Sequence, residues 1–153
     1  MSVIVTDIAA AIETTIETVL PALTKLDFVI DPNKQFNNDR DGGNRYGVWP
    51  GGIVNSEILT KVYVVDQEFR VQLLREYANR DGSDSNQRTV TYDLYDDLDT
   101  IMKELHQGRA GCPGAILNIQ FASASPPIFF EESDVALLDA FFTVKYTRNM
   151  TWS

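Results

Sequence analysis

The feature that most constrains the fold is a long alternation of apolar residues over residues 135–148, VALLDAFFTVKYTR. An apolar residue at every second position is the pattern of a β-strand with one face against a core. The apolar residues that share this face are Ala136, Leu138, Ala140, Phe142, Val144 and Tyr146. The pattern therefore predicts a final strand of unusual length.

The opposite face of this strand is partly apolar too, because it carries Leu137 and Phe141. Apolar side chains on a sheet face are stabilised when something removes them from water. If the helices of the domain lie on the first face, they do not cover the second. A loop of the same chain or a neighbouring subunit must then provide the cover.

Two amphipathic helices are expected. The first begins near Asp7, carries Ile8, Ile12 and Ile16 at helical spacing, and is ended or kinked by Pro21. The second spans residues 91–108, TYDLYDDLDTIMKELHQG, with acidic residues in its first turns, where they complement the helix dipole.

Three further segments have strand character. Residues 57–65 are rich in β-branched residues, and residues 68–78 alternate cleanly, so we expect a hairpin with its turn at Asp66 and Gln67. Residues 116–124 form another short alternating stretch. The chain is thus expected to be a single α+β domain over residues 1–153, in the order helix-strand-strand-helix-strand-strand. We expect a mostly antiparallel sheet with both helices on one face.

A long segment, residues 31–56, separates the first helix from the first expected strand, and we expect it to be an extended loop. Its first part, residues 31–52, shows neither helical nor strand periodicity. So long a structureless loop in a compact domain is usually functional or disordered. Aromatic and Arg side chains carry interface energy, so this loop is a candidate contact surface, although Trp49 could instead fold back over the core. The candidate contact residues here are Phe36, Arg40, Arg45, Tyr46 and Trp49, beside Leu137 and Phe141 on the last strand.

Composition excludes several classes of protein. The net charge of −9 disfavours nucleic-acid binding, because an acidic chain repels phosphates. No apolar run approaches the ~20 residues that cross a bilayer, and the N-terminus has no basic stretch typical of a signal peptide. The one cysteine, Cys112, excludes an intrachain disulfide framework.

No catalytic or metal-binding motif is complete. Asp93 and Asp97 lie one turn apart on the second helix and could reach a common ion, but dipole compensation on a solvated face is the better explanation. His106 has no nucleophile of a recognisable motif around it, and Cys112 lies in a Gly/Pro connector. We therefore expect no enzyme activity, no cofactor and no metal.

A partial calcium-loop pattern occurs within the long loop. Asn37, Asp39 and Asp41 have the spacing of the first three ligands, and Gly42 stands where such a loop turns. The twelfth position, which should be a bidentate Glu, is Val48. A polar loop without calcium accounts better for this segment.

The chain resembles the tail terminator proteins of long-tailed bacteriophages. The resemblance is carried by the helix TDIAAAIETTIETVLPAL, by EFRVQLLREYANRDG followed by the helix YDLYDDLDTIMKELHQ, and by the final strand VALLDAFFTVKYTR. It covers most of the chain as a pattern of elements. The long loop matches no motif of that family.

The resemblance implies a structural virion protein of the tail or neck, assembled in the host cytoplasm. It implies a ring, expected to be a hexamer, that caps the head-proximal end of the tail tube and ends tube polymerisation. The expected partners are other copies of the chain, the tail tube protein and the head-side connector or stopper protein. DNA would pass through the ring without specific binding, and no membrane is involved.

Two other interpretations stay open. One is a different neck or head–tail connector completion protein. The other, from a different class, is a small cytosolic ligand-binding module or an enzyme that uses Asp93, Asp97, His106 or Cys112.

Overall fold

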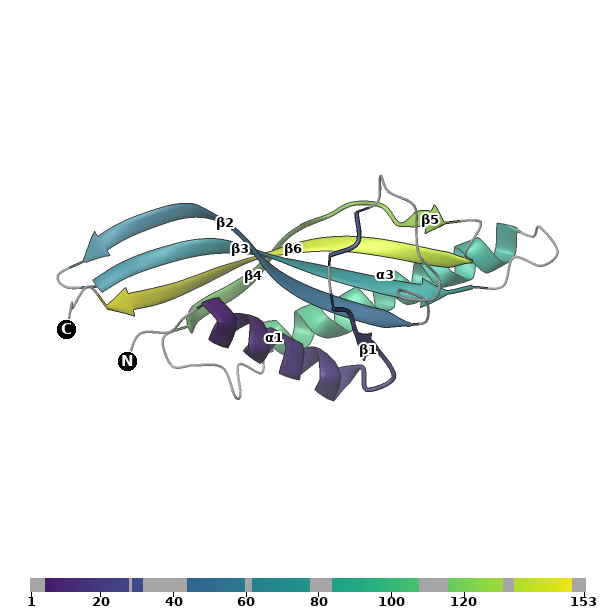
Figure 1. Cartoon of the computed structure of the whole chain (residues 1–153), viewed down its shortest axis with the longest axis horizontal. Helices are drawn as coiled ribbons and strands as arrows, with labels where there is room; N and C mark the ends of the chain where they lie inside the picture. The colour runs from purple at the N-terminus through teal and green to yellow at the C-terminus, as the bar shows by residue number, and fades with distance from the viewer. Residues whose placement is uncertain are drawn as a thin grey trace.

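The computed structural model describes residues 5–27, 29–31, 44–59, 62–77, 84–107, 116–130 and 134–149. Two helices, α1 (Val5–Val19) and α3 (Asp84–Gln107), lie against one sheet (Figure 1). The strands are β1 (Thr24–Lys25), β2 (Arg45–Leu59), β3 (Val62–Glu76), β4 (Ile116–Ala124), β5 (Ile128–Phe130) and β6 (Val135–Asn149). The expected α+β class is confirmed.

The sheet has the order β1-β2-β3-β6-β4, and β5 also pairs with β6. It is mixed rather than purely antiparallel, because β1 pairs with β2 in parallel; the other pairings are antiparallel. The expected order missed β1 and β5, which have two and three residues and are too short to show a period.

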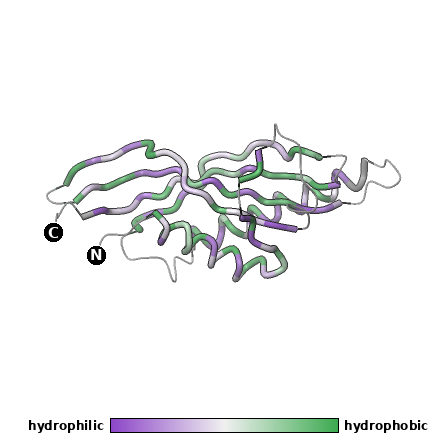
Figure 2. Tube along the Cα trace, viewed as in Figure 1, coloured by the Kyte–Doolittle hydropathy of each residue, from purple (hydrophilic) through white to green (hydrophobic). Residues whose placement is uncertain are grey.

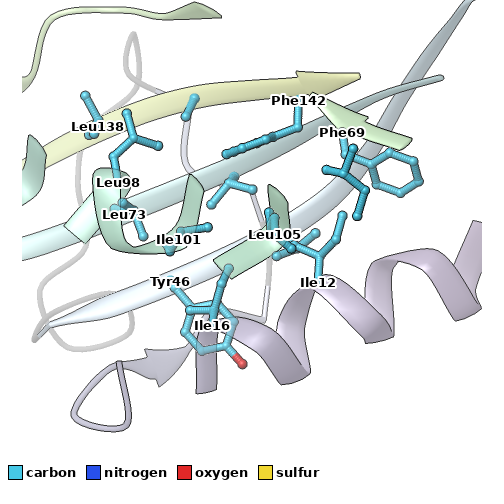
Figure 3. Close-up of a cluster of buried hydrophobic side chains, with 14 of the residues drawn as sticks. Ile12, Ile16, Tyr46, Phe69, Leu73, Leu98, Ile101, Leu105, Leu138 and Phe142 are labelled. Carbon is cyan, nitrogen blue, oxygen red and sulfur yellow. The ribbon is translucent and has the colours of Figure 1, made fainter. Parts of the chain in front are cut away.

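The main core lies between the helices and one face of the sheet (Figure 3). Ile12 and Ile16 of α1 and Ile101 of α3 point toward Phe69 of β3 and Phe142 of β6 in this layer. These residues come from the helical periods of α1 and α3 and from the alternations of β3 and β6. Helical and strand periods thus meet in one layer, as the sequence predicts.

A second, smaller cluster covers part of the other face of the sheet. Leu26 and Ile30, from the segment that follows β1, are buried there with Leu74 of β3 and with Val135 and Leu137 of β6. The cover of Leu137 is therefore a segment of the same chain, which is one of the two alternatives that the sequence left open.

The expected loop over residues 31–56 is wrong in its second half, because β2 begins at Arg45. Pairing with β3 holds this strand in place despite Pro50, Gly51 and Gly52, and the register shifts between Pro50 and Ile53. Pro and Gly are tolerated in edge strands and at bulges, where no second neighbour needs the missing donor.

Two other boundaries also differ from expectation. Strand β3 runs through Asp66 and Gln67, which do not turn: Asp66 lies opposite Lys145 of β6, and Gln67 is buried. Residues 60 and 61 separate β2 from β3 instead. Helix α3 begins at Asp84, whereas the sequence pattern predicts its start at Thr91.

Candidate interaction surface

Three strands extend together beyond the ends of the helices at one end of the molecule (Figure 1). We call this part the arm; it consists of residues 51–59 of β2 and the residues that the registers place beside them, 62–67 of β3 and 144–149 of β6, of which Val65, Val144 and Tyr146 still belong to the main core. Every residue of β2 from Gly51 to Leu59 is exposed. The arm therefore has solvent on a large part of its surface.

The arm carries a group of exposed apolar side chains. Ile53, Val54, Ile58 and Leu59 are each between 50% and 62% exposed. Figure 2 shows hydrophobic segments toward the projecting ends of β2 and β3, where the helical layer no longer covers them, whereas the end of β6 is hydrophilic. Isolated exposed apolar residues are normal on a protein surface, but a cluster on one projecting element marks an interaction site.

The cross-strand register places these residues on both faces of the arm. Ile58 lies opposite Tyr63, and Leu59 lies opposite Val62. Directly opposed residues share a face and successive residues alternate, so Ile58 and Leu59 point to different faces. A partner that covers the arm must therefore surround it or reach its edge.

A buried polar contact anchors the base of the arm. The side-chain amide of Gln67 donates to the carbonyl oxygen of Gly51 at 3.0 Å, and the hydroxyl of Tyr146 donates to the side-chain oxygen of Gln67 at 2.7 Å. These bonds join the three strands of the arm at the irregular part of β2. The arm is thus held to the body by side chains as well as by its ladder.

Of the residues expected to make contacts, Tyr46 and Leu137 are completely buried. The Tyr46 hydroxyl donates a hydrogen bond to the carboxylate of Glu17 in α1. Burial, together with that hydrogen bond, raises the pKa of Tyr46 above its ordinary value. In the described chain both residues thus serve the fold of the monomer.

Trp49 is half-buried against the second cluster, and the end of its indole lies over Gly47. Phe141 is half-buried too, with the guanidinium carbon of Arg70 5.9 Å from its ring centroid. Arg45 begins β2 and is half-buried. Phe36 and Arg40 lie outside the described residues.

The residues of the arm were missed as contacts because their β-branched run was divided between an expected loop and an expected strand. The dipeptide Ile53-Val54 after Gly51 and Gly52 was the available signal. No local pattern in the sequence indicates that this β-branched segment projects beyond the helices.

The candidate catalytic residues do not come together as a site. Asp97 is buried and accepts two hydrogen bonds from Arg75, at 2.6 and 2.9 Å, which raise the pKa of the guanidinium. His106 is exposed near the end of α3, and Cys112 lies outside the described residues. Among the residues that the structure describes, no three His, Cys, Asp or Glu side chains are placed to share a metal ion.

The partial calcium pattern is likewise divided. Val48, at its twelfth position, is buried within β2, while Asn37, Asp39 and Asp41 lie outside the described part of the chain. Neither of the described helices is long and apolar enough to span a membrane.

Comparison with known proteins finds similar folds among solved structures but no matching family. The sequence matches no protein-family model and no curated protein. A chain in a solved structure described as "Virion of native gene transfer agent (GTA) particle" has a similar fold, with a TM-score of 0.56. The match covers 91% of this chain and 93% of that chain, at 10% sequence identity. At this identity the likeness shows that the two chains share a fold along nearly their whole length.

Proposed function

We propose that this chain is a structural protein of a phage-like virion, and that copies of it form a ring that caps the head-proximal end of the tail tube. The observation that carries the proposal is the fold shared with a chain of a gene transfer agent virion over nearly all of both chains. A match of the whole chain, rather than of one motif, favours the same kind of part in the same kind of particle.

The arm supports an assembly role. Its exposed apolar residues, Ile53, Val54, Ile58 and Leu59, gain the most stability when another surface removes them from water. An asymmetric projection of this kind suits a heterologous contact, in which one surface of a subunit meets a different surface of the next. Such contacts close into a ring when the rotation between neighbours allows it.

The proposed mechanism is mechanical rather than catalytic. The ring binds the last ring of tube subunits, covers the interface to which another subunit would add, and replaces it with a surface that accepts the head-side connector. The net charge of −9 favours passage of DNA without specific binding, because the protein and the phosphates repel each other.

Removing the protein from the particle tests this proposal. Tails assembled without it should be longer than normal and variable in length in electron micrographs, because nothing stops the tube subunits from adding. Purified protein added to growing tubes should halt elongation and appear as a ring at one end. Tails of normal length in its absence would contradict the terminator role.

A different neck protein remains the second candidate, because the description of the matched structure names the whole particle. Binding of the labelled protein to purified tubes and to purified heads separates the two roles. A terminator should bind the tube end in the absence of heads. A connector completion protein should bind heads in the absence of tubes.

A further inference from the structure

The outer edge of β4 has almost none of the features that protect exposed sheet edges. Soluble proteins usually protect such edges with charged residues, proline or bulges. β4 has the sequence ILNIQFASA, without a charged residue or a proline. Its two register irregularities with β6 lie near residues 117 and 122, which leaves residues 118–121 regular.

This edge is open where the structure describes it. β4 pairs with β6 on one side, and no other described strand pairs with residues 118–124. The side chains of Asn118, Gln120 and Ser123 are exposed, small or uncharged, and do not obstruct an approaching strand. An edge like this favours the addition of another strand.

The opposite edge of the same sheet is open as well. β1 pairs with β2 only at Arg45 and Tyr46, so no described strand lies outside residues 48–59 of β2. The exposed apolar residues of the arm lie on this strand. The molecule thus has a strand edge without a described strand partner on each side of one sheet.

The directions of the two edges are compatible. Neighbouring strands from β2 through β3 and β6 to β4 are antiparallel, so β2 and β4 run in opposite directions. Rotation about an axis close to the strand direction leaves the direction of a strand unchanged. The β2 of a copy rotated in this way therefore meets β4 in antiparallel orientation, whose ladder is the more stable kind.

The two edges also match in their position along the direction of the strands. Following the registers across the sheet, Ile119 lies level with Val144, Gln67 and Ile53. Ile116 lies level with Tyr146, Val65 and Ser56 by the same registers. The strand tilt that closes a circular sheet shifts these levels by a few residues but keeps the same two segments facing each other.

We propose that residues 48–56 of one copy pair with the outer edge of β4 of the next copy, so that one antiparallel sheet continues from subunit to subunit. This inference rests on the proposed ring and names the contact that builds it. A second copy is the favoured partner because one heterologous contact covers both open edges together, and with them Ile53 and Val54 of the arm. A two-fold contact between two β4 edges would leave the arm exposed.

Disulfide trapping between two populations of the protein tests this contact. In a Cys112→Ser background, one population carries Gln120→Cys. The other carries a single cysteine at position 53, 55, 56 or 58. After mixing and mild oxidation, Gln120→Cys should form a covalent dimer with one or two of these partners, because only strand neighbours bring Cα atoms within about 4.4–6.8 Å. Gln120→Cys alone should not dimerise, and Tyr92→Cys on α3 is the matched exposed control.

A charge substitution gives a test without thiol chemistry. Gln120→Lys places a charge on the exposed edge and should raise the concentration needed for ring formation by about tenfold or more. Gln120→Ala should leave that concentration unchanged, and both variants should unfold as the parent does.

Several results would overturn the proposed contact. They are covalent dimers of Gln120→Cys alone, an absence of cross-links in rings seen by microscopy, or a protein that stays monomeric at every concentration. Capped tubes without any cross-link would reject the edge pairing and keep the proposed function. Cross-linked rings that never bind a tube would reject the function and keep the pairing.

Discussion

The side chain of Gln72 forms both backbone hydrogen bonds of Ile30. The amide nitrogen of Gln72 donates to the carbonyl oxygen of Ile30 at 2.8 Å, and its amide oxygen accepts the N–H of Ile30 at 2.9 Å. Gln72 is fully buried, so a side chain here takes the place of a strand neighbour. This contact fixes the segment that covers Leu137 on the second face of the sheet.

Replacing Gln72 by Leu should therefore loosen that segment. Both backbone groups of Ile30 would lose their partners, and a buried polar group without a partner costs about 1–3 kcal/mol. We expect a lower free energy of unfolding in urea and faster amide exchange at Ile30. The exposed Gln120→Leu is the matched control, and equal stability of the two variants would contradict the role of Gln72.

Gly47 is expected to be intolerant of a side chain because of Trp49. A Cβ atom on Gly47 would lie 2.0 Å from the indole Cη2, so Gly47→Ala must displace the indole. We expect a loss of about 1–3 kcal/mol from this overpacking. A red shift of the Trp49 fluorescence, measured in a Trp152→Phe background, should accompany it. Gly52→Ala, where the new Cβ meets nothing within 4 Å, should do neither.

Two aspartates of α3 should differ in their contribution to stability. Asp97 is only 7% exposed in its pair with Arg75, whereas Asp99 is 59% exposed in its pair with Lys103. Asp97→Asn should cost about 1.5–3 kcal/mol, because it weakens hydrogen bonds to a shielded charge. Asp99→Asn should cost about 0.5 kcal/mol or less. Similar unfolding midpoints in urea for the two variants would contradict this assignment.

Tyr46 should stabilise the protein at neutral pH, and this contribution should be lost in alkali. Burial and the bond to Glu17 raise the pKa of Tyr46 in the folded state, while an unfolded tyrosine ionises near pH 10.0. Above that pH the unfolded state loses the proton first, so the stabilising contribution is complete below it and declines as the pH rises. Tyr46→Phe should show a shallower decline of the urea midpoint between about pH 9 and pH 11. Tyr92→Phe, at an exposed position, should decline as the parent does.

The arm should contribute to association and little to the fold of the monomer. The double variant Val54→Thr, Ile58→Thr keeps both side chains β-branched but makes them polar. We expect its free energy of unfolding to change by less than about 0.5 kcal/mol and its association, measured by sedimentation, to weaken by about tenfold or more. Tyr92→Ala removes a side chain that is as exposed as Ile58, and it should leave association unchanged.

The sequence by itself determined the helices and strands in which apolar residues repeat several times at a regular spacing. The isoleucines of α1, the leucines of α3 and the alternation of β6 each recur often enough to identify a helix or a strand and the face that it buries. The overall class follows from these elements, because two one-sided helices and a strand with one continuous apolar face bury these faces most simply in one layer.

Only the tertiary structure decided β2 and the fate of the contact residues. Pro50, Gly51 and Gly52 disfavour a strand locally, and pairing with β3, a non-local interaction, overrides them. Tyr46 and Leu137 are buried for the same reason, since their partners Glu17 and Leu26 lie far away along the chain. The exposure of the arm depends on where the helices end in space, and no pattern within its own residues encodes that position.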